Sequence, residues 1–392
     1  MSIYLIVALS VLNAVALKAS KVLVALYAIE LGANPFAIGV LISMYAVFPL
    51  LLAVYAGKVS DRFGVRLPML FGSMGLSLGL VCPYLFPNLG SLYVSAGLIG
   101  MSFVFFHVSV HNLVGSLGDA EARTRNFSTF SLGAALSGFL GPLFAGFSID
   151  EMGHAPTYLY LSLLPALAAI VLLLFSHLFP QARARHEEEA EGSSVLDLFR
   201  HAPLRRTFIT SGMVLTGIDL YLFYFPIYGR SIGLSASLIG IVLSVYAAAA
   251  FVVRAGMPAL VRRSSEDTVL TYSLLVAGTT YLLFPFFENV YVLGIISFVL
   301  GLGLGCGQPL SIILTYNRSP EGRSGEALGV RIMVNKVTQI VVPVFFGSIG
   351  SVFGMVPVFW SNAALLASGG YLNGMGSRRP PLADETRQSR IS

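Results

Sequence analysis

Six side chains that are charged at neutral pH lie within long apolar stretches of this sequence, where a charge is expensive. An ionised residue at the centre of a membrane helix costs roughly 2.5–3.5 kcal/mol on insertion scales, so such residues usually face a cavity or one another. Five of the six are basic and one is acidic: Lys18, Lys21, Arg254, Arg331, Lys336 and Asp219. This balance predicts a cavity that favours an anion, or an amphiphile with an anionic head.

Further polar residues accompany these charges in the apolar stretches. Lys18 and Lys21 lie about one helical turn apart, and His107 and His111 lie four residues apart, so each pair shares one helix face. For the two histidines, a hydrogen-bonded packing pair is an alternative interpretation. The candidate cavity residues are Lys18, Lys21, His107, His111, Asp219, Gln308, Arg331, Asn335 and Lys336.

The composition defines the kind of chain that holds these residues. Of 392 residues, 56% are hydrophobic and only 11% are charged, with a mean hydropathy of +0.80, whereas soluble domains carry about 25% charged residues. Long continuous apolar runs predict an all-α membrane protein and not a barrel of short alternating strands. The net charge of +5 fits the basic bias of cytoplasmic loops better than a nucleic-acid partner.

Twelve apolar runs of about 20 residues can each cross a bilayer. The one long polar stretch divides them into an N-terminal six-helix bundle (1–180), a cytoplasmic linker (181–206), a C-terminal six-helix bundle (207–376) and a cytoplasmic tail (377–392). Of the 24 Lys and Arg residues, 18 fall in the even-numbered loops or the tail and one, Arg230, in an odd-numbered connection. This asymmetry predicts that both termini are cytoplasmic.

The two halves of the chain form a repeat. A shift of 201 residues aligns Gly32 with Gly233, Gly39 with Gly240, Ser43 with Ser244, Pro142 with Pro343 and Gly146 with Gly347. Two six-helix repeats predict two pseudo-symmetric bundles with a substrate site between them near the membrane midplane. The same shift aligns His107 with Gln308 and Lys18 with Asp219, for which the alternative interpretation is a structural ion pair between the halves.

One short segment carries a family resemblance. Residues 57–66 have the pattern G-x-x-x-D-R-x-G-x-R, formed by Gly57, Asp61, Arg62, Gly64 and Arg66. In the loop after the second span, this pattern resembles the signature of the major facilitator superfamily of secondary transporters. The resemblance implies a twelve-helix fold, a central cavity lined by spans one, four, seven and ten, and a cytoplasmic gate. It also implies that Asp61 contacts the start of span eleven, around residues 325–329.

Span five and span four indicate different branches of that superfamily. Gly138, Gly141, Pro142 and Gly146 resemble the glycine-proline motif of antiporter members, although the spacing is imperfect. Span four lacks the membrane-embedded arginine of the drug/proton antiporter motif and has His107 and His111 in that region. The first pattern favours antiport, whereas the second departs from proton-coupled drug export.

Together these patterns predict a secondary active transporter, not an enzyme, that moves a small organic anion or anionic amphiphile across the cell membrane by rocker-switch alternating access. Protons are the expected coupling ion, with Asp219, His107, His111 and Glu30 as candidate carriers. A broad-specificity drug/proton efflux antiporter is the alternative, and a non-transporting membrane sensor on the same fold is a remote one. No cofactor, metal or nucleic acid is expected, and the chain is expected to be monomeric.

Overall fold

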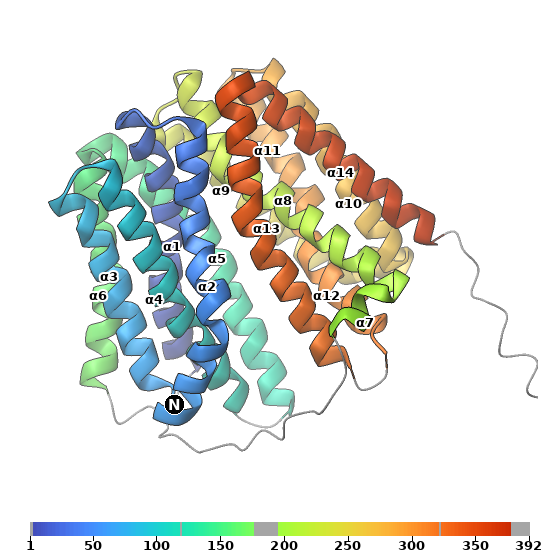
Figure 1. Cartoon of the computed structure of the whole chain (residues 1–392), viewed down its shortest axis with the longest axis horizontal. Helices are drawn as coiled ribbons and strands as arrows, with labels where there is room; N and C mark the ends of the chain where they lie inside the picture. Colours follow the sequence, from blue (N-terminus) through green and yellow to red (C-terminus); the bar gives the residue numbers. More distant parts are fainter. Residues whose placement is uncertain (1–2, 118–119, 176–194, 321–322, 378–392) are drawn as a thin grey trace, which may run out of the picture.

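The computed structural model describes residues 3–117, 120–175, 195–320 and 323–377, and within these ranges the elements are helical, with no β-strand (Figure 1). The N-terminal half contains six long helices. They are α1 (Ile3–Glu30), α2 (Pro35–Phe63), α3 (Arg66–Leu85), α4 (Leu89–Ser116), α5 (Ala120–Met152) and α6 (His154–Leu174).

The C-terminal half repeats this arrangement after a short helix, α7 (Val195–Arg200). Its elements are α8 (Ala202–Ser231), α9 (Ala236–Arg263), α10 (Glu266–Leu283) with the 3-10 turn η2 (Phe284–Phe286), α11 (Val290–Gly305), α12 (Gly307–Asn317), α13 (Ser324–Phe353) and α14 (Met355–Ser377). The helices α11 and α12 form one span that is interrupted at Cys306. Counting them as one, eleven helices of the described ranges are long and apolar enough to cross a membrane. The 23-residue α14 completes a set of twelve long helices.

Several helices extend further than the hydropathy pattern predicts. The apolar run of span two, residues 36–56, predicts a helix that ends at residue 56, but α2 continues to Phe63 and ends at Gly64, whose φ of 80° stops the helix. In the expected linker, α7 and the start of α8 occupy residues 195–200 and 202–206, while residues 181–194 lie outside the described ranges. A helix satisfies its own backbone hydrogen bonds, so it can continue as a polar segment beyond the hydrocarbon layer that hydropathy detects.

The two halves meet chiefly through α2 with α13 and through α5 with α9. The helices α2 and α13 lie side by side at one end of the molecule and diverge toward the other (Figure 1). We call the end where α1 ends at Glu30 and α2 begins at Pro35 the closed end. The opposite end, where α2 ends at Phe63, is the open end.

Hydrogen bonds between the halves follow the 201-residue repeat. Ser43 Oγ of α2 donates to the Ile340 carbonyl of α13, and Ser244 Oγ of α9 donates to the Phe139 carbonyl of α5, both at 2.8 Å. A shift of 201 residues converts the first bond into the second. These bonds lie nearer the closed end of each helix, so the halves are joined there by two equivalent contacts.

Glycines bring the backbones of the two halves close together at the same level. Gly39 of α2 faces the Pro343 carbonyl, and its repeat equivalent Gly240 of α9 faces the Pro142 carbonyl. A Cβ atom at either glycine would overlap the facing carbonyl oxygen. The absence of a side chain is therefore what allows each pair of helices to cross at backbone contact.

A third pair of equivalent contacts caps helices across the interface. Asp150, near the end of α5, accepts hydrogen bonds from the backbone N–H groups of Ala236 and Ser237 at 3.0 and 2.8 Å, at the N-terminus of α9. Its repeat equivalent Ser351, near the end of α13, accepts from the Phe36 N–H at 2.8 Å, at the N-terminus of α2. We call these caps, together with the serine and glycine contacts, the closed-end seal.

Candidate transport cavity

Asp219 of α8 is the centre of a charged cluster contributed by α1, α8 and α13. Its side chain is 5% exposed, and the charges of Lys21 and Lys336 both act on it. Lys336 Nζ donates to Gln339 Oε1 at 3.1 Å, and the Gln339 side chain in turn donates to Asp219. Asp219 Oδ2 has no hydrogen-bond partner among the described residues. The carboxylate therefore lies between two cations with one oxygen able to accept a further group.

Lys21 of α1 occupies the junction between the halves. Its Nζ lies 5.2 Å from the centre of the Phe223 ring of α8 and 5.8 Å from that of the Tyr45 ring of α2. Cation–π attraction of about 0.5–2 kcal/mol offsets part of the lost hydration of the ammonium group. The Tyr45 hydroxyl donates to Ser20 Oγ at 3.2 Å, which fixes one of these rings.

Lys18 points to a different neighbour from the one that the repeat indicates. Its Nζ donates to the Ala134 carbonyl of α5 at 2.8 Å, and no ion pair joins it to Asp219 within the described part of the chain. The structural ion pair that was the alternative interpretation for Lys18 and Asp219 is thus not formed among the described residues. Instead Lys21, one helical turn after Lys18, is the lysine of α1 that faces α8. Gly138 and Gly141 leave room for Lys18, since a Cβ atom at Gly141 would lie 2.8 Å from Lys18 Cβ.

The rest of the predicted helix-five motif lies at the closed-end seal. Gly146 approaches the backbone of Ala236 at the start of α9, and Pro142 presents its carbonyl to Gly240. The four motif residues thus have two structural settings: Gly138 and Gly141 pack against α1, while Pro142 and Gly146 pack against the other half. This arrangement gives a physical reason for small residues at these positions without assigning a direction of transport.

Arg331 of α13 is buried, 5% exposed, among neutral oxygen atoms. Its guanidinium donates to Ser311 Oγ at 2.8 Å and to Gln308 Oε1 at 2.6 Å. Ser311 donates to Ser211 Oγ, which donates to Asn335 Oδ1 at 3.1 Å. Within the described residues, no carboxylate forms an ion pair with Arg331. The positive charge is hydrogen-bonded but not neutralised.

The interruption of span ten positions part of this network. Cys306 separates α11 from α12, so Gln308 lies in the first turn of α12. Gln308 Nε2 has no hydrogen-bond partner among the residues that the structure describes. Gln308 and Arg331 therefore both present N–H groups, which can donate hydrogen bonds to an anion.

The two histidines of α4 contact each other. His107 Nε2 and His111 Nε2 lie 3.2 Å apart, so one proton between these nitrogens satisfies both. Their rings pack on Phe103 and Phe130, with ring centres 5.3 and 5.0 Å apart respectively. His107 is exposed, and the charge of Lys336 from the other half acts on it. The hydrogen-bonded pair that was the alternative interpretation is present, and it also faces the charged cluster.

The predicted gate segment is helical up to Phe63. Arg66 opens α3 and donates from Nε to the Leu172 carbonyl of α6 at 3.0 Å, which ties α3 to α6 inside the first half. Arg62 lies over the ring of Phe63 at 5.3 Å. The side chain of Asp61 lies outside the described part of the structure, so its contact with residues 325–329 stays a prediction. The gate residues form the set Gly57, Asp61, Arg62, Gly64 and Arg66.

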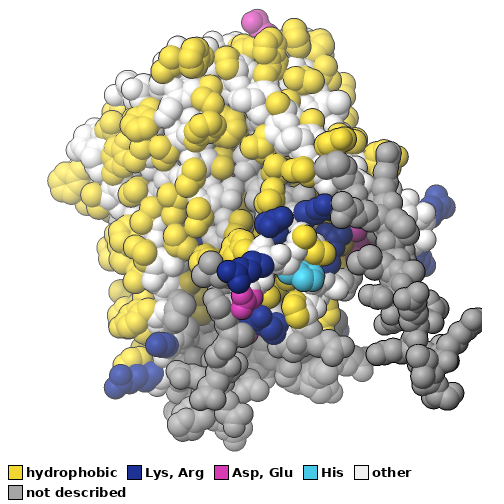
Figure 2. Space-filling view, turned by 45° about the vertical axis from the view of Figure 1, so that its right-hand side comes forward, with side chains coloured by type: hydrophobic (Ala, Val, Ile, Leu, Met, Phe, Trp, Pro, Cys, Tyr) yellow, Lys and Arg dark blue, Asp and Glu magenta, His cyan; other side chains and the backbone are white. Residues whose placement is uncertain are grey.

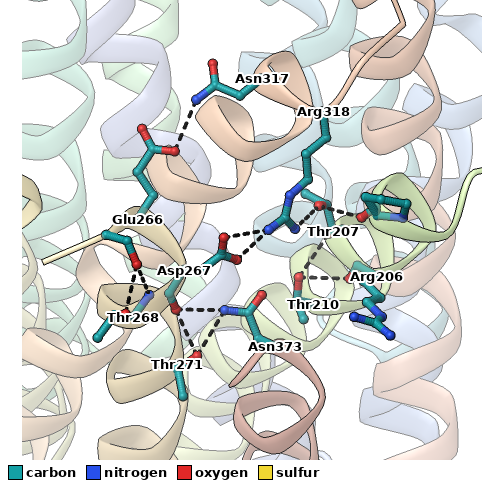
Figure 3. Close-up of polar contacts among 12 residues, drawn as sticks. Arg206, Thr207, Thr210, Glu266, Asp267, Thr268, Thr271, Asn317, Arg318 and Asn373 are labelled. Carbon is teal, nitrogen blue, oxygen red and sulfur yellow. Dashed lines mark hydrogen bonds and ion pairs between the residues drawn. The ribbon is translucent and has the colours of Figure 1, made fainter. Parts of the chain in front are cut away.

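At the open end, a polar network joins four helices of the second half (Figure 3). Arg318, which caps α12, donates to both carboxylate oxygens of Asp267 on α10 at 2.6 Å and to Thr207 Oγ1 of α8 at 2.8 Å. Asn373 of α14 donates to the Asp267 carbonyl at 2.8 Å. This network therefore joins α8, α10, α12 and α14 at the open end of the second half.

Sequence reasoning missed several of these residues. Gln339 is polar, lies among apolar residues and is one helical turn from Lys336, so the sequence could have identified it as a candidate cavity residue. Asp150 and Ser351 are separated by 201 residues, so extending the repeat by a few positions would have paired them. Nothing in the sequence pattern indicated that Arg318 meets Asp267, because that contact depends on how α12 and α10 pack.

Comparison with known proteins places this arrangement in a family. A sequence profile of the Major Facilitator Superfamily matches residues 6–271 and 260–390. Multidrug resistance protein MdtG from Proteus mirabilis is 22% identical over 336 residues, which cover 84% of this chain and 82% of that protein. Tetracycline resistance protein, class H, from Pasteurella multocida is 23% identical and covers 80% of this chain and 79% of its own length.

A solved structure has the same fold. The crystal structure of a POT family transporter in complex with a thioalcohol-conjugated peptide superposes with a TM-score of 0.81 over 96% of each chain, at 14% sequence identity. This likeness and the profile confirm the predicted all-α fold of twelve membrane helices in two six-helix bundles. The chain therefore belongs to the Major Facilitator Superfamily of membrane transporters.

Proposed function

We propose that this chain is a proton-coupled secondary transporter of a small organic anion or an anionic amphiphile. The observation that carries the proposal is the unneutralised Arg331 beside a cluster with an excess of positive charge. Arg331, Lys18, Lys21 and Lys336 are basic, and Asp219 is the only carboxylate that the described structure places among them. An uncompensated buried charge typically costs 3–5 kcal/mol, so an anionic solute would relieve an existing cost.

Proton coupling in this proposal follows from competition for the lysines. Ionised Asp219 attracts Lys21 and Lys336 and so opposes their binding to an anion. A proton on Asp219 removes this competition, so anion binding and protonation favour each other. This linkage predicts that anion affinity rises as the pH falls and that the proton and the anion move in the same direction.

A drug/proton efflux antiporter is the second candidate, and the resistance proteins among the relatives favour it. In that case a cationic drug would bind the Asp219 carboxylate through the unpartnered Oδ2, and a proton would displace the drug. Affinity for the drug would then rise with pH. The two candidates therefore predict opposite pH dependences at the same residue.

The membrane orientation is also part of the proposal. Lys and Arg side chains gather toward the end of the molecule at which α7 lies, below a largely hydrophobic face (Figure 2). Positive charge favours the cytoplasmic side. We therefore assign the open end to the cytoplasm, with both termini there, in the cell membrane of the source organism, or the inner membrane if it is bacterial. The proposed transporting unit is a monomer.

The decisive experiment uses purified protein in proteoliposomes with an imposed pH gradient, screened over organic anions and cationic dyes. For an anion transporter, Arg331→Gln, Lys21→Gln and Lys336→Gln should abolish anion uptake. Asp219→Asn should strengthen equilibrium anion binding and flatten its pH dependence. Arg262→Gln, which removes an exposed charge at the end of α9, is the matched control and should transport normally.

Two results would contradict the anion proposal. One is unchanged anion transport in the three charge-removing variants. The other is loss of dye binding in Asp219→Asn together with drug affinity that rises with pH in the unmodified protein, which would establish the antiporter instead.

A further inference from the structure

A groove on the outer surface of the first half is separate from the charged cluster. It has a volume of about 600 Å³ and lies between α2 and α3, with α4 as its floor. Its walls are almost entirely apolar and include Tyr55, Val59, Phe63, Phe71, Met101 and Phe105. The volume falls within the range of about 300–1,000 Å³ that is typical of small-molecule sites.

The packing of three helices explains why the groove exists. The helices α2 and α3 each pack extensively on α4 but only slightly on each other. Gly72 lets α3 lie close to α4, because a Cβ atom there would lie 2.7 Å from the Ser102 carbonyl oxygen. Meanwhile α2 follows α13 at the closed end (Figure 1). The turn at residues 64–65 joins α2 and α3 at the open end, and because the two helices pack so little on each other the groove remains between them.

The groove is suited to a hydrocarbon chain. Tyr55, Phe63 and Phe71 are 59%, 55% and 65% exposed, so the walls are not filled by neighbouring protein. The eight-residue step from Tyr55 to Phe63 corresponds to a depth of about 12 Å along α2. It ends at the charged turn between α2 and α3, where the hydrocarbon layer gives way to head groups. A site at this depth of a membrane protein meets lipid tails and not water.

Basic residues flank the mouth of the groove. Lys58 and Arg62 are exposed and lie on the same face of α2 as the lining residues Tyr55, Val59 and Phe63, because these positions are spaced by three or four residues. Arg62 lies over the Phe63 ring at 5.3 Å, which places its guanidinium at the rim. Among the carboxylates whose side chains the structure describes, which do not include Asp61, none forms an ion pair with either basic residue.

We propose that this groove binds one anionic phospholipid, with an acyl chain between α2 and α3 and its phosphate at Lys58 and Arg62. The aromatic walls bind the chain, and the two basic side chains select a negatively charged head group. A lipid held there would rest on the gate segment itself, so membrane composition would influence the loop that joins α2 to α3. The proposal does not depend on which solute the central cavity carries.

The test uses the purified full chain in detergent with phosphatidylglycerol that carries a photoreactive diazirine on an acyl chain. Phosphatidylcholine with the same label is the neutral comparison, and labelled peptides are mapped after irradiation. Phosphatidylglycerol should label residues 55–75 and 98–105 preferentially. The double variant Lys58→Gln/Arg62→Gln should weaken this labelling about thirtyfold, as expected from about 1 kcal/mol for each basic residue near the surface.

Two further variants make the result specific. Arg262→Gln/Arg263→Gln removes the same charge from the equivalent helix end of the second half, where Arg263 of α9 corresponds to Arg62 of α2, and should leave labelling unchanged. Met101→Trp should fill the groove floor and reduce labelling by either lipid. If the Lys58/Arg62 variant does not fold, Met101→Trp and the comparison of the two lipids still decide the matter.

Three outcomes would overturn the proposal. The first is equal labelling by the two lipids, which would mean that the surface is ordinary annular contact. The second is labelling spread evenly over the lipid-facing helices. The third is labelling of the groove that survives Met101→Trp in protein that remains monodisperse.

Discussion

The closed end and the centre of this molecule differ in how closely they follow the internal repeat. At the closed end, Ser43 and Ser244 make equivalent hydrogen bonds, and Gly39 and Gly240 meet equivalent proline carbonyls. At the centre, Lys18 has the repeat position of Asp219, but the two make unrelated contacts. The closed-end seal is symmetric between the two halves, whereas the polar residues at the centre differ between them in type and in contacts.

The physical reason is that the two regions have different tasks. Two helices can cross at backbone contact only where the residues at the crossing are small. Both helix crossings of the seal therefore need small residues at equivalent positions. A solute without two-fold symmetry, in contrast, presents different groups to the two halves. Arg331 and its neutral acceptors therefore need no counterpart, and the equivalent position in the first half is Phe130.

The largest expected effect comes from breaking the seal at either of its equivalent glycines. Gly39→Leu and Gly240→Leu should each reduce transport by at least about a hundredfold, because the side chain would occupy the space of the facing carbonyl. Transport into proteoliposomes measures the loss, and spin-label distances across the closed end measure its separation. Gly294→Leu is the control, since a Cβ atom there would have no neighbouring atom within 4 Å. A large effect at only one of the two sealing glycines would contradict their equivalence.

A smaller and unequal effect should come from the two caps. Asp150 accepts two backbone hydrogen bonds with a charged group, whereas Ser351 accepts one with a neutral group. Loss of a helix cap costs about 0.5–2 kcal/mol. We expect Asp150→Ala to shift the population away from the closed arrangement about tenfold and Ser351→Ala about threefold. Single-molecule energy transfer between labels at the closed end would measure both populations, and the reverse order would show that charge is not the difference.

A moderate kinetic effect is expected at the gate segment. By resemblance to the family, Asp61→Asn should slow transport several-fold while changing equilibrium substrate binding much less. Initial rates in proteoliposomes and calorimetric binding on the same preparation test this together. An equal loss of rate and affinity would argue that the segment is part of the binding site and not a gate.

The smallest effect on transport should come from Arg318 at the open end. Its contact with Asp267 joins helices within one half and does not cross between halves. Arg318→Gln should lower the unfolding temperature, by the equivalent of about 1–3 kcal/mol for a charge-assisted hydrogen-bonded pair, and leave the closed-end distances unchanged. A shift of those distances would show that the second half does not move as a rigid unit.

The sequence by itself determined the architecture. Long apolar runs and the 201-residue repeat predicted twelve helices and two equivalent halves, because hydropathy and repetition are local properties of the chain. The same repeat identified Gly39, Gly240, Pro142, Pro343, Gly146 and Gly347, although it did not show that these residues form a seal. The sequence also identified most of the polar residues that surround the cavity, because a charged residue within an apolar span can be recognised from its neighbours alone.

Only the tertiary structure decided which of these residues meet. Lys18 and Lys21 lie on one face of α1, and the packing of that helix sends the first to α5 and the second toward Asp219. The neutral partners of Arg331, the capping of α9 by Asp150 and the groove beside Arg62 likewise depend on distances between helices. Such distances arise when helices from separate parts of the chain pack together, so no local pattern contains them.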